Sequence, residues 1–327
     1  MSTATEIQRI QQAKSDLRTA IQAKGVTVPS ATLIDGYAAL VSQIPTGGGT
    51  VTELSYPAWL KDGDTHLWLD IVNSYQLTQQ LRIRMIGTID WGDGTVESVS
   101  VTTYTTFSHT YAATGKYRID LHPTSGTFYL GGASSSYCIM GTRSTAYYAR
   151  VMALYQVEVG TSRITTLSNY AFYYCVGLLR AYVPKTITTL GTYVFGYCYA
   201  LREVDFEDST TITSTSCNYV MYTCYALQNF SGFCPPSLTT LLGNFYHCWG
   251  LTDITVPSGV TSIGDNSIRF CYGLKHLRCK PTTPPTATAN ALASLPTTCV
   301  IEVPSASLAA YQAAANWSTY ASQMVGV

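Results

Sequence analysis

Cysteine recurs at a nearly constant interval along the second half of the chain. Cys175, Cys198, Cys224, Cys248 and Cys271 are separated by 23, 26, 24 and 23 residues. Each has an apolar residue three positions before it and a leucine three positions after it. These partners are Phe172, Phe195, Met221, Phe245 and Ile268 on one side, and Leu178, Leu201, Leu227, Leu251 and Leu274 on the other. Because a unit this short cannot bury its apolar side alone, the period predicts a solenoid of stacked repeats.

Each repeat combines two kinds of apolar spacing. Positions i, i+3 and i+6 around the cysteine share one face of a helical turn, so a short helical turn is expected there. Pairs such as Ile254 and Val256 then show the alternation of a strand. A second apolar pair precedes each turn: Ile164/Leu167, Ile187/Leu190, Leu238/Leu241 and Val260/Ile263. The third unit departs from this pattern, since Thr215 and Cys217 stand where an aliphatic pair is expected.

The strings within these units resemble a known repeat family. SNYAFYYC at 168–175 and ITVP at 254–257 are similar to the BspA-like class of leucine-rich repeat. The resemblance covers about 160–281, and 128–159 is expected to be a degenerate first unit. It implies a leucine-rich repeat solenoid over 124–281, followed by a C-terminal capping segment over 282–327. Within that segment Ser305 is expected to cap a closing helix over Leu308 and Tyr311.

Residues 51–123 change to a period of two, which is typical of strands. Leu67, Leu69 and Ile71 alternate with polar residues, and Asp93-Gly94 between two such runs predicts a hairpin, because the tight turn needs positive φ. These features predict a small antiparallel β-sandwich. WGDGT at 91–95 and FSHTY at 107–111 resemble a PKD-type immunoglobulin-like domain. The resemblance implies a structural spacer without an active site.

Residues 1–46 predict a helical segment that cannot form a core by itself. Ile7, Ile10, Leu17 and Ile21 lie on one helical face, and a Gly-rich linker over 47–50 follows. LRTAIQAKGV at 17–26 resembles a segment at the start of phage tail and minor structural proteins. It implies attachment to other virion proteins or homo-oligomerisation. The predicted fold class is therefore multidomain and mainly β: a helical segment, a PKD/Ig-like sandwich, a repeat solenoid and a cap.

Composition excludes several classes of function. Lys and Arg number 19 against 19 Asp and Glu, only 12% of the chain is charged, and no basic run exists to bind nucleic acid. The hydrophobic share of 46% is too high for a disordered chain. No apolar stretch is long enough for membrane insertion, and the polar N-terminus lacks the apolar core of a secretory signal.

No catalytic or metal-binding motif is recognisable. The ten cysteines contain no C-x-x-C pair, and stacked rungs keep neighbouring Cβ vectors parallel, so buried free thiols are favoured over disulfides and metal ligation is the least favoured. The histidines stand in no triad, and Asp90 and Asp93 are interpreted as turn residues rather than as a calcium site. We therefore expect no enzyme activity and no cofactor.

Aromatic residues fill the outward positions of the repeat turns. They are Tyr173, Tyr174, Tyr197, Tyr199, Tyr222, Tyr225, Tyr246, His247, Trp249, Phe270 and Tyr272. Stacked rung upon rung, they predict an aromatic stripe along one edge of the solenoid. Tyr and Trp are typical binding anchors, so a recognition surface is favoured; the alternative is that the rings only pack on one another.

Two settings fit a helical attachment segment, a spacer and a recognition array in that order. The first is a bacteriophage virion protein of the tail-fibre or receptor-binding type, assembled in the host cytoplasm, whose repeats recognise a host-surface glycan or protein. The second is a bacterial cell-surface adhesin, where BspA-like arrays are commonly met; a general protein-binding scaffold is a third option. Because the sequence starts without a signal or anchor, the virion setting is the first expectation.

Overall fold

A computed structural model describes most of the chain beyond the N-terminal segment. The residues that it describes are 56–132, 134–142, 147–214, 217–231, 233 and 235–327. The chain divides into two compact units, Met1–Ala58 and Trp59–Val327. The expected attachment helix with Ile7, Ile10, Leu17 and Ile21, and the linker over 47–50, lie outside the described residues. The second unit carries every feature discussed below.

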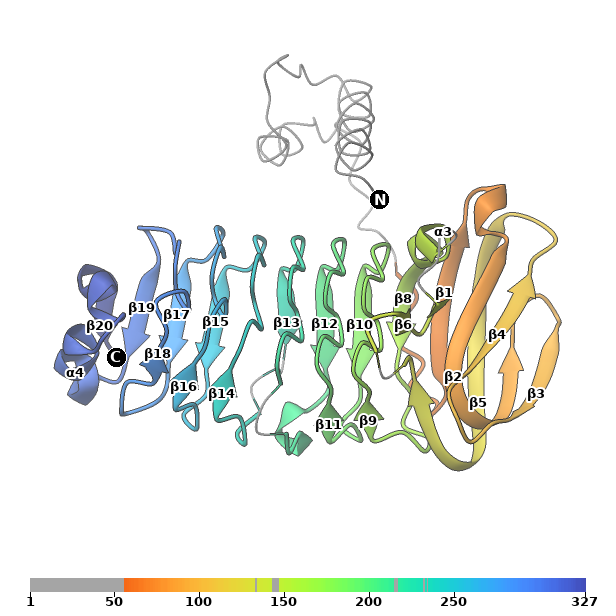
Figure 1. Ribbon diagram of the computed structural model, residues 1–327, viewed down its shortest axis with the longest axis horizontal. Helices are drawn as coiled ribbons and strands as arrows, with labels where there is room; N and C mark the ends of the chain where they lie inside the picture. Colours follow the sequence, from red (N-terminus) through yellow and green to blue (C-terminus); the bar gives the residue numbers. More distant parts are fainter. Residues whose placement is uncertain (1–55, 133, 143–146, 215–216, 232, 234) are drawn as a thin grey trace, which may run out of the picture. The chain divides into compact units, whose positions relative to one another are not determined.

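The repeats form a solenoid with two parallel ladders of strands (Figure 1). The longer strands are β8 (Leu154–Glu158), β10 (Arg180–Val183), β12 (Glu203–Phe206), β13 (Asn229–Ser231), β15 (Asp253–Val256), β17 (His276–Cys279) and β19 (Val300–Val303). The shorter are β9 (Thr166–Leu167), β11 (Thr189–Leu190), β14 (Thr240–Leu241), β16 (Ser262–Ile263) and β18 (Thr286–Ala287). Equivalent residues of neighbouring rungs pair directly within each sheet, as Val204 does with Ala181 and Phe230. Among the described residues, the pairing is interrupted between β13 and β15 and between β11 and β14.

The apolar residues expected inside the solenoid are buried. The residues three before and three after each repeat cysteine are between 0% and 2% exposed, as are the cysteines themselves. In the irregular third unit, Ile212 takes the position of Ile187 and Leu238, and it is 2% exposed. The N–H of each donates to the carbonyl three residues earlier, which shows that the positions are equivalent. One continuous core therefore runs through all the rungs.

The segment around each cysteine is a series of turns rather than the expected helical turn. The N–H groups of Tyr170, Phe172 and Tyr174 donate to carbonyls of the next rung, while those between them donate within the segment. Residues four apart in each segment, such as Tyr170 (φ 62°) and Tyr174 (φ 59°), have left-handed backbone. Positive φ ends any right-handed helix. The buried residues at i, i+3 and i+6 therefore belong to successive turns and not to one helical turn.

The strands before the repeats belong to the same sheet as the first rungs. They are β1 (Thr65–Ile71), β2 (Thr78–Asp90), β3 (Val96–Ser100), β4 (Thr105–Thr110) and β5 (Gly115–Leu130). β1 lies between β5 and β8 and is antiparallel to both, so a nine-stranded sheet continues from β3 to β13 (Figure 1). β5 crosses the domain boundary expected at 123 without a break. Instead of the expected separate β-sandwich that acts as a spacer, these strands, which we call the β-cap, continue the sheet of the repeats and cover the first rung of the solenoid.

The hairpin at Asp93-Gly94 forms where the sequence predicts it. Asp90 pairs with Val96 at the ends of β2 and β3, and the φ angles of Gly92 and Gly94 are 80° and 92°. The carboxylates of Asp90 and Asp93 accept N–H groups two residues ahead, at 2.8 and 3.0 Å. Both aspartates are therefore engaged as turn residues.

Short elements complete the unit. Between β1 and β2 lies η2 (Ser74–Gln76); β6 (Tyr137–Cys138), β7 (Gly141–Thr142) and α3 (Tyr147–Ala153) precede β8, and η3 (Ser209–Thr211) follows β12. The last rung is closed by η4 (Ser305–Ser307), α4 (Leu308–Ala313), η5 (Ser318–Gln323) and β20 (Met324–Gly326). Tyr311 and Trp317 are 0% exposed and donate to carbonyls of Pro281 and Pro285. The sequence predicts Ser305 as the cap of this helix, but Ser307 holds that position, without a side-chain capping bond.

Candidate recognition surface

The aromatic side chains of the repeat turns lie in columns that run along the solenoid. We name each column by its offset from the repeat cysteine. The plus-one column holds Tyr199, Tyr225, Trp249 and Tyr272. Its ring centroids are 5.2, 4.3 and 6.2 Å apart in that order, with interplanar angles of 18°, 35° and 42°. The rings thus lie nearly parallel at the N-terminal end of the column, and the tilt between neighbouring rings increases toward its open C-terminal end.

The minus-one column consists of two stacked pairs. Tyr174 and Tyr197 stack at 4.4 Å, and His247 and Phe270 stack at 4.6 Å, with Thr223 between the pairs. All five residues have φ between 57° and 62°. Left-handed backbone costs about 1–2 kcal/mol for a residue with a Cβ, and ring stacking contributes about 0.5–1.5 kcal/mol for each pair. Stacking therefore offsets part of the strain that this turn imposes.

The minus-two column is only partly aromatic. Tyr222 and Tyr246 stack at 4.6 Å, while Gly196 and Arg269 occupy the equivalent places in other rungs. Tyr173, which the sequence predicts to point outward, is only 9% exposed. Its ring meets the edges of Tyr174 and Tyr197 in T-shaped contacts. Tyr173 is therefore a packing residue and not a contact residue.

One further column of stacked rings was not predicted from the sequence. Tyr170, Tyr193 and Tyr219, each five residues before the repeat cysteine, stack at 5.7 and 4.6 Å with interplanar angles of 9° and 6°. The constant offset from the cysteine is the signal that could have identified them. In the next rung, Gly243 has the same left-handed backbone, with φ 66°. An added Cβ there would collide with the ring of Tyr219, so glycine ends the column.

Most ring faces of this aromatic surface are covered by other rings. Of the eleven predicted recognition residues, only Tyr272 is exposed, at 57%; the others are buried or half-buried. Packing of ring on ring therefore accounts for the parallel rings. Ring edges, hydroxyl groups and the C-terminal end of the plus-one column stay accessible to a ligand.

The aromatic surface is electrically neutral over most of its area. Burial raises the pKa of Tyr193, Tyr199 and Tyr222, so their phenols stay protonated at neutral pH. Burial, and secondarily the charge of Arg269, lower the pKa of His247. The neutral imidazole accepts the indole N–H of Trp249 at 3.0 Å. This surface is suited to neutral polar ligands.

The repeat cysteines connect consecutive rungs. The Sγ of Cys198 donates to the carbonyl oxygen of Phe172 at 3.1 Å, and Cys224, Cys248 and Cys271 make the equivalent contact to their preceding rungs at 3.0 to 3.2 Å. All nine described cysteines are buried thiols rather than disulfides. Burial raises the pKa of the eight described thiols from Cys175 to Cys299, to about 12 for Cys217 and about 11 for Cys299. Cysteine combines small apolar volume with one weak donor, which explains its use here.

We expect these thiols to be unreactive until the protein unfolds. The thiolate is the nucleophile, and both the raised pKa and the burial withhold it from a reagent. Iodoacetamide labelling of native protein, followed by peptide mass spectrometry, should show no modification of Cys224 or Cys248, and full modification after denaturation. Cys299, with the smaller rise in pKa, should react first. Rapid native labelling of Cys248 would contradict the buried ladder.

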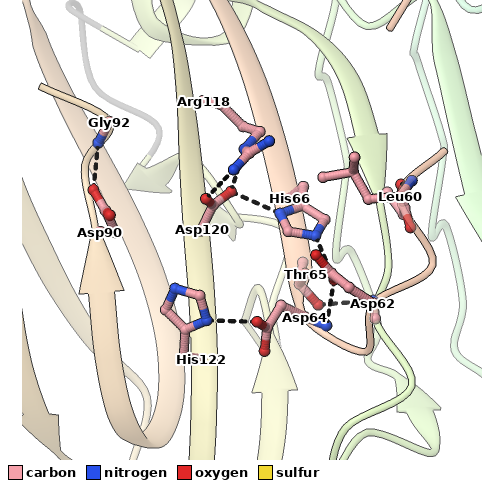
Figure 2. Close-up of polar contacts among 12 residues, drawn as sticks. Leu60, Asp62, Asp64, Thr65, His66, Asp90, Gly92, Arg118, Asp120 and His122 are labelled. Carbon is pink, nitrogen blue, oxygen red and sulfur yellow. Dashed lines mark hydrogen bonds and ion pairs between the residues drawn. The ribbon is translucent and has the colours of Figure 1, made fainter. Parts of the chain in front are cut away.

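A cluster of charged side chains joins the β-cap to the first rung (Figure 2). His66, 1% exposed, bonds through Nδ1 to Asp120 at 2.6 Å and through Nε2 to Asp62 at 2.8 Å. Asp120 also accepts two bonds from Arg118, both at 2.7 Å. Glu158 of β8 accepts the backbone N–H groups of residues 60 and 61 at 2.7 and 2.5 Å. The bonds of His66 tie β1 to β5, and those of Glu158 tie the segment before β1 to β8, so the cluster is a structural junction.

The stability of this junction should depend on pH. Burial disfavours the charged form of His66, but hydrogen bonds to Asp120 and Asp62 outweigh it and raise the pKa. The resulting stabilisation is complete below the unfolded-state pKa of about 6.5 and is lost as the pH rises through the higher pKa of the folded state. Urea unfolding at a series of pH values should show this decline. H66Q should abolish it; an unchanged profile in H66Q would contradict the assignment.

Among the described residues, no group of three or more His, Cys, Asp or Glu side chains is placed to hold a metal ion. None of the helices in the described ranges combines the length and apolar character needed to cross a membrane.

Comparison with known families identifies the repeats. Residues 165–286 match the family described as BspA type Leucine rich repeat region, in 6 copies. This stretch is a BspA-type leucine-rich repeat region. The match agrees with the strings SNYAFYYC and ITVP in the sequence. No curated protein matches the chain.

Solved leucine-rich repeat structures are similar to parts of the chain at low identity. The Leucine Rich Repeat protein of T. pallidum is 24% identical over 38% of this chain and 57% of that one, with a TM-score of 0.34. A leucine-rich repeat protein from Bacteroides ovatus is 18% identical over 46% and 47%, with a TM-score of 0.33. A leucine rich cell surface protein from Faecalibacterium prausnitzii is 18% identical over 57% and 52%, with a TM-score of 0.34. The chain spans about half the length of these proteins.

Proposed function

We propose that this chain is a non-enzymatic binding protein that recognises a cell-surface target through the aromatic surface of its repeats. The observation that carries the proposal is the neutral aromatic surface, whose rings recur on consecutive rungs and open at the C-terminal end. BspA-like arrays are commonly met in bacterial surface proteins, and the repeats here match that family. An adhesin-like role is therefore the leading proposal, and localisation at a cell surface goes with it.

Adsorption to cells tests the proposal. Fluorescently labelled full-length protein is incubated with intact bacterial and animal cells, and bound protein is measured by flow cytometry. A variant with Tyr225→Ala, Trp249→Ala and Tyr272→Ala should lose at least about tenfold in adsorption, as expected when aromatic anchors are removed.

The control variant is Thr255→Ala, on the half-buried outer position of strand β15. It should adsorb like the wild type. The triple variant removes three rings from a partly stacked column, which can lower its stability. The melting temperatures of the wild type and both variants are therefore measured, and adsorption is compared below the lowest of them. If the triple variant adsorbs as well as the wild type, the aromatic surface serves packing only and the proposal fails.

A bacteriophage virion protein is the second candidate, favoured by the segment at 17–26. That resemblance rests on the sequence alone, and its residues lie outside the described part of the chain. In this setting residues 1–46 would attach the chain to other virion proteins, and the repeats would bind a host-surface protein or glycan. Immunogold electron microscopy of phage particles from a strain that encodes the chain tests it. Labelled tails would support the virion role, and unlabelled particles would exclude it.

A further inference from the structure

Among the described residues, no other ring stacks on the last ring of the plus-one column. The aromatic neighbours of Tyr272 are Trp249, at 6.2 Å and 42°, and Phe270, at 5.9 Å and 48°. Both are tilted away from parallel, whereas Tyr199 and Tyr225 lie at 18°. Tyr272 is 57% exposed. More than half of this residue is therefore accessible to a ligand.

The next rung does not continue the column. Ile268 and Phe270 donate their N–H groups to the carbonyls of Ala291 and Ala293, which sets the register between the rungs. In that register Pro296 occupies the position after Tyr272. The column is aromatic for four rungs and then stops, so the exposed ring belongs to one defined place on the solenoid.

The exposed apolar area around Tyr272 is too small for a protein interface. A stable interface buries about 800 Å² on each partner around an apolar centre. Among the described residues, the other exposed large apolar side chains are Leu60, Val72, Tyr75, Val96, Met152, Val325 and Val327, none of them on rungs from Cys175 to Cys271. A single exposed ring with a tilted second ring matches the size of one sugar residue.

Polar residues follow the two rings along the chain. Thr252 and Lys275 come three residues after them and are exposed, and the N–H of Lys275 donates to the carbonyl of Thr252 at 2.7 Å. Asp253, also exposed, accepts the hydroxyl of Thr252 at 2.8 Å and a bond from Arg278 at 2.8 Å. Arg278 also bonds to Glu302 at 3.1 Å. Hydroxyl, ammonium and carboxylate groups can bond to the hydroxyls of a sugar. Because two cationic side chains stand with two carboxylates, this group does not select an anion.

We propose that Tyr272 and Trp249 form a subsite for a neutral pyranose, whose C–H face packs on the Tyr272 ring. An aromatic face is electronegative and attracts polarised C–H groups, and Tyr272 is the most exposed ring of the column, at 57%. The proposal rests on the proposed recognition function and names its ligand class. It assigns the binding to the C-terminal end of the aromatic surface and excludes the covered rings around Tyr199.

Isothermal titration of the full-length protein tests the subsite with four probes. Maltohexaose, cellohexaose and chitohexaose are neutral, and hexagalacturonate is the acidic comparison. At least one neutral hexaose should bind, and Tyr272→Ala should weaken it by at least about tenfold, or about 1.4 kcal/mol. Tyr272→Phe, which keeps the ring face, should change the affinity by less than about threefold, under about 0.7 kcal/mol.

The matched control is Tyr199→Ala, which removes a ring of the same column whose face is covered by Tyr225. It should bind the hexaose like the wild type. Failure of every neutral probe to bind, binding of hexagalacturonate alone, or an equal loss in Tyr199→Ala would each overturn the subsite. If the protein binds no sugar but still adsorbs to cells, and protease treatment of the cells abolishes that adsorption, the subsite is overturned and the proposed function stands. If the protein neither binds sugar nor adsorbs to cells, the subsite and the proposed function are both overturned.

Discussion

Deleting residues 59–130 should prevent the repeats from folding into a soluble protein. The deletion removes the β-cap, whose β1 pairs with β8 along Leu67↔Val157 and Trp68↔Gln156. It would leave β8 with unpaired N–H and C=O groups and would expose the buried side chains of the first rung. An uncovered strand edge and an uncovered core are both prone to aggregation. Expression in the soluble fraction, followed by circular dichroism and analytical ultracentrifugation, measures the effect.

The control is deletion of residues 1–55, which leaves the whole sheet from β3 to β13 intact. That chain should be soluble, with the thermal transition of the full protein. The two deletions also separate two roles for the β-cap. If residues 51–123 were an independent spacer, as their PKD-like strings imply, the repeats would fold without them. A soluble monomeric solenoid from the first deletion would therefore contradict the capping role.

The sequence is most informative where a structural rule repeats within a short span. The period of the cysteines and the apolar residues around them predicts the buried ladder, because every rung presents the same side chains to the same core. The pair Asp93-Gly94 predicts its hairpin, because the turn needs positive φ at a known place. In both cases the determining residues lie close to one another along the chain.

The parts that could not be predicted depend on distant pairing or on unusual backbone. Nothing near β1 indicates that His66 will lie opposite Glu158, since that register is set by tertiary packing. The apolar spacing around the cysteines fits a helix and therefore predicts helical turns. Tyrosines with left-handed backbone interrupt any such helix, and only the hydrogen bonds between rungs reveal why.

The aromatic surface shows the same division. A list of outward positions identifies the rings of the plus-one column but cannot tell a covered ring from a free one. Tyr199 and Tyr272 stand at the same offset from their cysteines, yet Tyr225 lies over the first and no ring in the described part of the chain stacks on the second. The difference arises because the column ends at Tyr272. Composition therefore locates the surface, and only the structure locates its exposed end.

Replacing Phe195 by alanine should cost about 3–5 kcal/mol of unfolding free energy, the typical range for a buried Phe. Phe195 is 0% exposed, and its ring lies parallel to that of Phe172 at 5.2 Å and 8°. Its carbonyl accepts the N–H of Cys198 and the thiol of Cys224, so a shift of its backbone would loosen two rungs at once. Urea unfolding followed by circular dichroism measures the loss.

Phe195→Leu is the matched control, because it keeps most of the apolar volume and should cost less than about 1.5 kcal/mol. The chain has five tryptophans, so spatial resolution by tryptophan fluorescence requires variants that keep only Trp91, buried in the β-cap, or only Trp317, buried in the C-terminal closure. Stacked repeats are coupled only through their neighbours, so a large defect at one rung should separate the transitions reported from the two ends. A cost below about 1 kcal/mol with one shared transition would show that the cavity is filled by repacking and that Phe195 does not set the contact between rungs.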